Sequence, residues 1–422
     1  MMKGRLKPGA ISWAFYDWAN SAYVLCIVTA IYPVFFANYY SQGLDPGTTT
    51  GRAGFVVSLT SLLVFLAAPF LGSLAQQGRS RKRFLACFVF PGCLLTVGLF
   101  FVPEGAWLAA SAIYLLATFC YYAGNLFYDS LLCEVSDEKE AHMVSGLGFS
   151  LGYFGSVILF AVIFLAIQKA ESFGMTKTDV TRWSFIAVAA WWFIFTWPLL
   201  LKVPESKPSE KQETTGSTLR TLKETGSEII QNKPVLLFLL AYWFYIDGVH
   251  TIIAMASTYS TVLGIPQSQL MPAIILVQVV GVPFALLFGW LGARFGAKPM
   301  IGVGLVIYFG VTLWGYALDG GTVDIGPLAI PKIFILGFLI GSAQGGIQSL
   351  SRSFFNQLIP REKSAAYFGF YNMIGRSAAI LGPLVMGFIA QSTGNPRFGI
   401  LSIVVLFIIG GALLFRVRPT ED

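Results

Sequence analysis

Long apolar runs alternate with short polar segments along almost the whole chain. An α-helix rises 1.5 Å per residue, so about 20 apolar residues cross the ~30 Å hydrocarbon core of a bilayer. Runs of about that length occur twelve times. They lie near residues 10–39, 53–75, 84–102, 107–129, 143–168, 183–201, 234–262, 270–292, 300–318, 328–350, 364–390 and 398–415. We therefore predict an all-α integral membrane protein with twelve transmembrane helices.

A longer polar segment separates the sixth run from the seventh. It predicts an N-terminal six-helix bundle over 1–201, a cytoplasmic linker over 202–233 and a C-terminal six-helix bundle over 234–422. The first part of the linker is charged and poor in apolar residues, which is typical of a mobile segment. Its later part, from Leu219 to Ile230, has apolar residues spaced as in an amphipathic surface helix.

The composition favours a membrane protein over a soluble one. Of all residues 55% are hydrophobic and only 12% are charged, whereas soluble domains carry about 25% charged residues. The five cysteines show no metal-ligand spacing, and no phosphate-binding loop, dinucleotide fingerprint or nucleophile elbow occurs. We expect no metal, no cofactor and no enzymatic activity.

The basic residues predict the orientation in the membrane. The net charge is +7, and most of the 28 Lys and Arg residues fall in segments that share one side when the N-terminus is inside. Cytoplasmic segments carry such an excess of basic residues. We therefore expect a multi-pass protein of the cell (inner) membrane with both termini in the cytoplasm. This distribution explains the positive charge without a nucleic-acid partner.

Two of the apolar runs contain the same polar pattern. The first holds Trp13-Ala-Phe-Tyr-Asp17-Trp-Ala-Asn20-Ser21, and the seventh holds Trp243-Phe-Tyr-Ile-Asp247-Gly-Val-His250-Thr251. Residues three and four apart share a face of a helix, so each copy forms one polar stripe. A carboxylate in hydrocarbon is costly, and it is expected to face a bundle interior or an aqueous cavity. These six residues are our first candidates for binding substrate or protons: Asp17, Asn20, Ser21, Asp247, His250 and Thr251.

The depth of the two aspartates bears on their role. Each lies roughly 15–21 Å from the cytoplasmic end of its run, near the middle of the bilayer. A carboxylate that gains and loses a proton there suits proton coupling. The alternative is a structural aspartate that caps a broken helix or pairs permanently with an arginine. His250 is either a proton relay beside Asp247 or a packed neutral imidazole.

Further polar residues lie in or beside other runs. Gln344, Gln348 and Arg352 step by four along the tenth run, where the glutamines suit a polar ligand. Arg352 either grips a carboxylate or extends to the cytoplasmic interface. Asn125 and Asp129 form a pair in the fourth run, and Asp129 serves either gating or static pairing.

Arg376 is the cation deep in the eleventh run. A buried arginine needs a partner, for which Asp17, Asp247 and an anionic substrate group are the candidates.

Short glycine-rich basic turns follow the second and the eighth runs. They are Gly72 to Arg83 and, about 220 residues later, Gly289 to Lys298, a repeat that indicates two six-helix halves. Their basic residues, with Arg352 and Asp129, are the candidates for gating. Within the turns these are Arg79, Arg81, Arg294 and Lys298.

The six-plus-six plan with these turns resembles the major facilitator superfamily. The superfamily's turn motif has an aspartate where this chain has Gln76 and Ala293, so the latch attributed to that motif is in doubt here. More narrowly, the chain resembles the vacuolar amino-acid effluxers of fungal autophagy and their bacterial permease relatives. The strings that carry this resemblance are Tyr16 to Tyr23, Asp247-Gly-Val249, Gln344 to Pro360 and Phe368-Gly-Phe-Tyr371.

The resemblance implies a major facilitator fold and the transport of small metabolites, with amino-acid export as the family's best-known role. We therefore expect a monomeric secondary transporter of an amino acid, with efflux favoured, working by alternating access and coupled to protons. A nucleoside, an organic acid or a drug-like compound is the alternative cargo. A receptor or scaffold without transport is the alternative class, and a membrane enzyme is disfavoured because no nucleophile–base constellation stands out.

Overall fold

The computed structural model describes residues 6–43, 46–75, 80–137, 140–205, 218–378 and 381–418. Within these ranges, twelve helical stretches are long and apolar enough to cross a bilayer, as predicted. They run over Ala10–Tyr40, Arg52–Ala75, Arg81–Phe101, Trp107–Val135, Ala141–Gln168, Lys177–Lys202, Lys233–Ala256, Ser268–Phe295, Ala297–Tyr316, Lys332–Leu358, Arg361–Thr393 and Pro396–Arg416. The all-α membrane architecture is confirmed.

The described residues form two compact units. The first comprises Met1–Ser136, Leu151–Leu222 and Glu362–Met373, and the second comprises Asp137–Ser150, Lys223–Arg361 and Ile374–Asp422, in so far as these ranges are described. The units differ from the sequence halves in two short segments, 137–150 and 362–373, each of which packs with helices of the other half. We keep the halves on either side of the linker as our proposal for the duplicated repeats.

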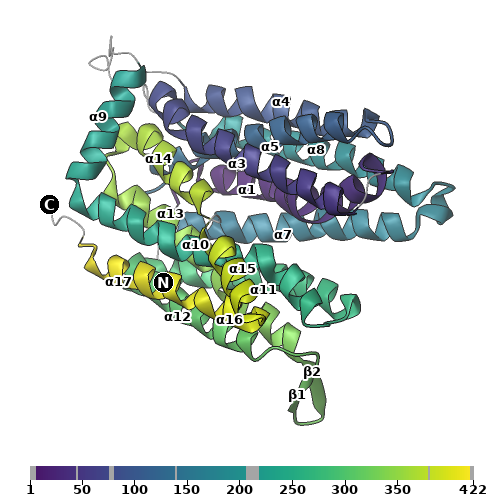
Figure 1. Cartoon of the computed structure of the whole chain (residues 1–422). Coiled ribbons are helices and arrows are strands. Elements are labelled where there is room, and N and C mark those ends of the chain that lie inside the picture. The colour runs from purple at the N-terminus through teal and green to yellow at the C-terminus, as the bar shows by residue number, and fades with distance from the viewer. Residues whose placement is uncertain are drawn as a thin grey trace. The chain divides into compact units, whose positions relative to one another are not determined.

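In the first half of the chain the main helices are α1 to α8. Their bounds are α1 Ala10–Tyr23, α2 Ile31–Phe35, α3 Pro46–Ala75, α4 Arg81–Phe101, α5 Trp107–Ser130, α6 Leu132–Val135, α7 Ala141–Gln168 and α8 Lys177–Lys202. In the first unit α1 packs against α8, and α4 packs against both α5 and α8 (Figure 1). Its buried core is aromatic and includes Trp13, Trp192, Tyr16 and Tyr23.

The first span is not a continuous α-helix. Two π-helical segments, Val24–Ala30 and Phe36–Tyr40, flank the short helix α2. Pro33 lies within α2 and has no backbone N–H to donate, so the regular hydrogen-bond ladder is interrupted there. Single π-helical turns in membrane helices often accompany functional sites.

The start of α1 depends on a glycine. Gly9 caps α1 with φ 86, a left-handed conformation that glycine adopts without steric cost. A Cβ at this position would lie 2.6 Å from Pro204 Cδ and 3.0 Å from the Lys202 carbonyl oxygen. The beginning of the first span therefore lies against the end of the sixth.

The linker and the second half contribute helices α9 to α17 and one β-hairpin. Their bounds are α9 Thr218–Gln231, α10 Lys233–Val262, α11 Gln267–Phe295, α12 Ala297–Tyr316, β1 Thr322–Ile325, β2 Leu328–Pro331, α13 Lys332–Leu358, α14 Ser364–Ser377, α15 Leu381–Thr393, α16 Pro396–Ser402 and α17 Val404–Arg416. In the second unit α13 packs against α11 and α12, and α10 packs against α17. Figure 1 shows this arrangement in green to yellow.

The amphipathic helix expected at the end of the linker is α9. It buries Thr225 and Ile229, while Leu219 and Ile230 are exposed. The segment expected to be mobile, 206–217, lies outside the described residues.

The hairpin was not predicted. The tenth span was predicted to begin near residue 328. In the structure residues 328–331 form β2, and the helix starts at Lys332. A short apolar run occurs in strands and in helices, so the run by itself does not distinguish the two. Gly326-Pro327 was the local signal of a turn.

Candidate functional site

Asp17 is held in the interior of the first unit by a tyrosine. Its carboxylate oxygen Oδ2 accepts a hydrogen bond of 2.8 Å from the hydroxyl of Tyr128 on α5, and Asp17 is only 7% exposed. Tyr128 is itself fixed, because Trp13 Nε1 donates to its carbonyl oxygen at 2.9 Å and the two rings stack at 4.4 Å. The first aspartate therefore faces protein, as its cost in hydrocarbon requires.

One turn further along α1, two amides meet. Asn20 Nδ2 donates to Asn125 Oδ1 at 3.2 Å, and the Ser21 hydroxyl lies 3.4 Å from Asn20 Oδ1. A Cβ at Gly152 of α7 would come within 2.5 Å of Ser21 Oγ, so glycine allows α7 to approach this stripe closely. The predicted polar faces of the first and fourth spans are thus brought together in one strip.

Asp247 has a different partner. Its Oδ2 accepts a 2.8 Å hydrogen bond from the backbone N–H of Gly382, the second residue of α15, and Asp247 is 1% exposed. The first N–H groups of a helix have no partner within the helix, and the positive end of the helix dipole attracts a carboxylate. The carboxylate of Asp247 therefore binds the start of α15, and its role in proton binding stays a prediction.

Thr251 packs against the same place. A Cβ at Gly382 would lie 1.9 Å from Thr251 Oγ1, so only glycine fits between α10 and the start of α15. His250 is half-buried on α10 and lies close enough to Arg376 for their charges to interact. The second stripe therefore lies beside α14, which ends at Ser377, and α15, which begins at Leu381.

Gln344 and Gln348 lie half-buried on α13. Within the described part of the chain, neither side-chain amide makes a hydrogen bond that would fix it. Two adaptable amides one turn apart suit a polar ligand better than a purely structural role.

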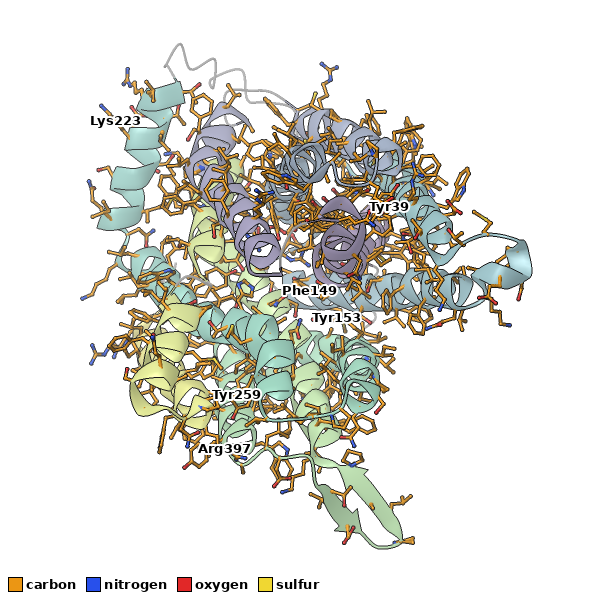
Figure 2. The ribbon with its side chains drawn as sticks, turned by 45° about the vertical axis from the view of Figure 1, so that its right-hand side comes forward. Tyr39, Phe149, Tyr153, Lys223, Tyr259 and Arg397 are labelled. Atoms are coloured by element: carbon orange, nitrogen blue, oxygen red, sulfur yellow. The ribbon has the colours of Figure 1, made fainter. Side chains whose placement is uncertain are left out.

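Arg352 is buried rather than extended to the interface. It is 4% exposed, its Nε donates to Ser145 Oγ at 2.9 Å, and its Nη2 donates to the Ser145 carbonyl oxygen at 3.2 Å. Its guanidinium lies 4.6 Å from the ring centre of Phe149, which Figure 2 labels. The early part of α7 thereby binds α13 within the second unit.

Asp129 makes the corresponding contact in the first unit. Its Oδ2 accepts a 3.2 Å hydrogen bond from Asn372 Nδ2 on α14, and the next residue, Ser130, accepts through its carbonyl oxygen from Ser364 Oγ at 3.2 Å. Asp129 on α5 and Arg352 on α13 therefore occupy matching places, each holding the first part of a helix that begins in the other sequence half.

The basic turns are built into these contacts. Arg81 Nη1 donates to the Ser130 carbonyl oxygen at 3.0 Å and lies 3.3 Å from Glu134. The carboxylate of Glu205 accepts from the Arg81 backbone N–H and from the Ser80 hydroxyl, at the start of α4. Arg79 and Gln76 lie outside the described residues.

The second turn behaves differently. Arg294 is exposed beside the rings of Trp290 and Phe295. Lys298 Nζ donates to the carbonyl oxygens of Phe415 and Val417, both at 2.8 Å, at the end of α17. A lysine at a helix C-terminus satisfies its last carbonyl groups.

Sequence reasoning missed several residues of this constellation. Tyr128 lies three residues after Asn125, so the helical spacing that picked out Asn125 and Asp129 also pointed to it. Lys82 was overlooked although it repeats the role of Lys298, donating to the carbonyl oxygens of Leu200 and Val203 at 3.2 and 2.8 Å. Glu205 carried no signal, because its partner is distant in sequence.

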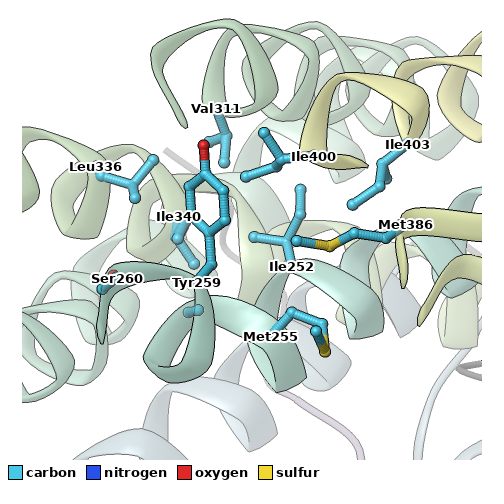
Figure 3. Close-up of a pocket in the computed structure, with 11 residues that line it drawn as sticks. Ile252, Met255, Tyr259, Ser260, Val311, Leu336, Ile340, Met386, Ile400 and Ile403 are labelled. Atoms are coloured by element: carbon cyan, nitrogen blue, oxygen red, sulfur yellow. The ribbon is translucent and has the colours of Figure 1, made fainter. Parts of the chain in front are cut away.

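A small pocket in the second unit does not resemble a site for a polar solute. It lies among α10, α12, α13, α15 and α16 and is lined mainly by apolar side chains, among them Ile252, Ile340 and Met386 (Figure 3). The hydroxyl of Tyr259, which lines it, is already engaged with the Gly315 carbonyl oxygen at 2.8 Å. The polar strips on α1 and α5, and on α10 and α13, are therefore the better candidates for substrate contact.

Comparison with known proteins supports a transporter. The chain matches the family described as "Vacuole effluxer Atg22 like" over residues 47–138 and 133–420. It is 37% identical to the "uncharacterized MFS-type transporter YxiO" of Bacillus subtilis (strain 168), over 98% of this chain and 95% of that protein. It is 28% identical to Autophagy-related protein 22 of Yarrowia lipolytica (strain CLIB 122 / E 150), over 63% of this chain and 48% of the fungal one. The chain thus matches about half the length of that fungal relative.

Solved structures agree on the fold. The proton:xylose symporter XylE has a TM-score of 0.71 at 13% identity, covering 98% of this chain and 95% of that one. The human organic anion transporter MFSD10 (TETRAN) has a TM-score of 0.75 at 11% identity, covering 96% and 99%. At such low identity these structures establish the fold and not the substrate.

Proposed function

This chain belongs to the vacuole effluxer Atg22-like family of the major facilitator superfamily, and from that premise we propose that it exports an amino acid or a similar small polar metabolite by alternating access. It is a multi-pass membrane protein of the major facilitator type. We propose in addition that both termini are cytoplasmic, that transport is coupled to protons and that the working unit is a monomer. The observation that carries the proposal is the buried Asp17–Tyr128 pair beside the Asn20–Asn125 pair.

The chemistry of this strip suits a zwitterion. A carboxylate attracts an ammonium group strongly where water is scarce, because the local dielectric constant is low. Side-chain amides offer both donors and acceptors, so Asn20 and Asn125 can exchange their mutual hydrogen bond for one to a ligand. Tyr128 holds Asp17 in a defined orientation, which reduces the cost of ordering on binding.

Asp247 suits a conformational role better than direct substrate contact. A proton on its carboxyl group would remove the negative charge that the start of α15 attracts, and so weaken the bond to Gly382. Protonation would thereby change the geometry at the start of α15. We infer that Asp247 couples proton binding to movement, while Asp17 contacts the cargo.

Transport by reconstituted protein tests the proposal. Proteoliposomes with and without an inward proton gradient are assayed for flux of a labelled amino-acid mixture. Asp17→Asn is expected to reduce flux about tenfold or more with either gradient, since about 1.4 kcal/mol of lost interaction is a factor of ten. Asp247→Asn is expected to abolish the stimulation by the gradient while exchange persists. Asp324→Asn, an exposed change in β1, serves as the control.

The outcomes separate the alternatives. Unchanged flux in both single variants would disprove the assigned roles of the aspartates. Flux of nucleosides or organic acids instead of amino acids would keep the transporter and overturn the substrate. No flux of any of these solutes by protein that is folded and monodisperse would favour a receptor or scaffold.

A further inference from the structure

The β-hairpin between α12 and α13 has two chemically different faces. Its register pairs Thr322 with Pro331, Val323 with Ile330, Asp324 with Ala329 and Ile325 with Leu328. Directly opposed residues of two strands share a face, and side chains alternate along each strand. Val323, Leu328 and Ile330 therefore lie on one face, and the other face carries Thr322, Asp324, Ala329 and Pro331.

The aliphatic face is not buried by the protein. Leu328 is 64% exposed, and Val323 and Ile330 are only half-buried. In Figures 1 and 2 the hairpin projects as an arm from the ends of α12 and α13. A two-stranded hairpin in water is marginally stable at best, so an apolar face of this kind needs cover.

The base of the hairpin is rigidly fastened. Trp314 Nε1 of α12 donates to the Lys332 carbonyl oxygen at 3.0 Å, and the Lys332 backbone N–H donates to the Gly321 carbonyl oxygen at 3.1 Å. Lys332 Nζ lies 2.7 Å from Asp319 Oδ2, and the Gly321 N–H donates to Asp319 Oδ1 at 2.9 Å. The tight turn uses Gly326 with φ 62, the conformation that a type II′ turn needs at its first central position.

The charged part of this base is held together at neutral pH. The hydrogen bond from Lys332, followed by that from the Gly321 N–H, lowers the pKa of Asp319. A carboxyl group with a lowered pKa stabilises the folded form above its unfolded pKa, and this contribution is lost as the pH falls through the folded value. The contact between Asp319 and Lys332 is therefore present across the physiological range.

The base is expected to lie at the level of the membrane surface. Trp314 and Tyr316 are close to the end of a spanning helix, where aromatic residues mark the membrane–water boundary. The lipid-facing side of α12 continues toward the arm through Val306 and Leu313, which are 71% and 46% exposed. A strand of four residues extends about 13 Å from such a base.

We propose that the β1–β2 hairpin is an interfacial anchor whose aliphatic face, with Val323, Leu328 and Ile330, rests on the bilayer surface at the outer end of α12 and α13. Its continuity with two membrane spans identifies the lipid surface as the cover. A protein strand is the less suitable partner, because each strand has only four residues and β2 ends in a proline. The face with Asp324 then points to water.

Site-specific labelling tests the anchor in the whole protein. Leu328→Cys and Ala329→Cys place an environment-sensitive fluorophore on opposite faces at adjacent positions. The background is Cys87→Ser, because Cys87 is the exposed cysteine among the described residues. The labelled protein is reconstituted in phosphatidylcholine–phosphatidylglycerol vesicles and quenched either with a lipid spin-labelled near the headgroup or with aqueous iodide. Val306→Cys serves as the lipid-facing reference.

The expected result is several-fold stronger quenching by the spin-labelled lipid at 328 than at 329, with the reverse order for iodide. Equal access of iodide to both positions would show an arm in water and overturn the proposal. Protection of position 328 from both quenchers would show a protein partner and would overturn it equally. Gel filtration and unchanged thermal unfolding confirm that each labelled variant is folded, since both substituted positions are on the surface.

Discussion

The two matched aspartates show how one sequence pattern supports two roles. Asp17 accepts from the hydroxyl of Tyr128 on a neighbouring span, whereas Asp247 accepts from a backbone N–H at the start of α15. In both cases a buried carboxylate has a donor, which its desolvation requires. The difference arises from what faces each aspartate: a side chain within α5 in the first unit and a backbone N–H at the start of α15 in the second.

We predict that Tyr128→Phe lowers both the stability of the first unit and the rate of transport. Loss of a buried hydrogen bond to a charged group costs about 1.5–3 kcal/mol, whereas a bond between neutral groups contributes about 0.5–1.5 kcal/mol. The matched control is Tyr259→Phe, which removes a hydroxyl bonded to a neutral carbonyl oxygen. Thermal unfolding and amino-acid flux are measured for both. Equal effects of the two substitutions would contradict a special contribution of the Tyr128–Asp17 bond.

The start of α15 is the element on which coupling depends in our proposal. The start of α15 has its N–H of Gly382 bound by Asp247, and Thr251 leaves no room for a side chain there. A helix start that is capped by a titratable group can change when that group binds a proton. In our proposal the start of α15 thus links the protonation of Asp247 to the position of the eleventh span.

Substitution of Gly382 by alanine is predicted to displace the start of α15. The new Cβ would lie 1.9 Å from Thr251 Oγ1, so we expect the backbone of Gly382 to shift and its bond to Asp247 to weaken. We expect a loss of about 1–3 kcal/mol in stability and loss of stimulation by the proton gradient. Gly387→Ala, in the same helix with nothing within 4 Å of its Cβ, is expected to be neutral or slightly stabilising.

The double variant Gly382→Ala with Thr251→Ala provides the rescue, because it removes the hydroxyl that causes the closest clash. Recovery of thermal stability without recovery of proton stimulation would separate the packing of Thr251 from the cap. A Gly382→Ala variant indistinguishable from Gly387→Ala in both assays would refute the account of this helix start.

Across the molecule, a matching helix crossing in each compact unit depends on a pair of glycines. In the first unit a Cβ at Gly72 would meet the Ala365 carbonyl oxygen at 2.4 Å, and Gly369 faces the Ala68 carbonyl oxygen at 2.8 Å. In the second unit a Cβ at Gly146 would meet the Ala285 carbonyl oxygen at 2.7 Å, and Gly289 faces the His142 carbonyl oxygen at 2.9 Å. Small residues allow membrane helices to approach closely, and this pairing repeats in both units.

We predict that Gly72→Ala and Gly146→Ala destabilise the protein by about 1–3 kcal/mol each, because backbone atoms cannot move aside as a side chain can. Both variants are expected to unfold at a lower temperature and to transport more slowly. Gly310→Ala on α12, whose Cβ would have nothing within 4 Å, is the control and is expected to keep wild-type stability. Unchanged unfolding of Gly146→Ala would show that α7 and α11 do not cross as closely as described.

The sequence alone was sufficient to predict the twelve spans, because a run of about 20 consecutive apolar residues is typical of a transmembrane helix. It also indicated the surface helix α9 and the polar stripes, since helical periodicity is a local property. It could not show that Tyr128 binds Asp17, that Gly382 binds Asp247 or that Ser145 binds Arg352. Those pairs join residues more than 100 positions apart, and only the packing of helices brings them within hydrogen-bond distance. The hairpin could not be predicted for a different reason. A four-residue apolar strand has the same sequence pattern as the first turn of an apolar helix, and only its pairing partner distinguishes the two.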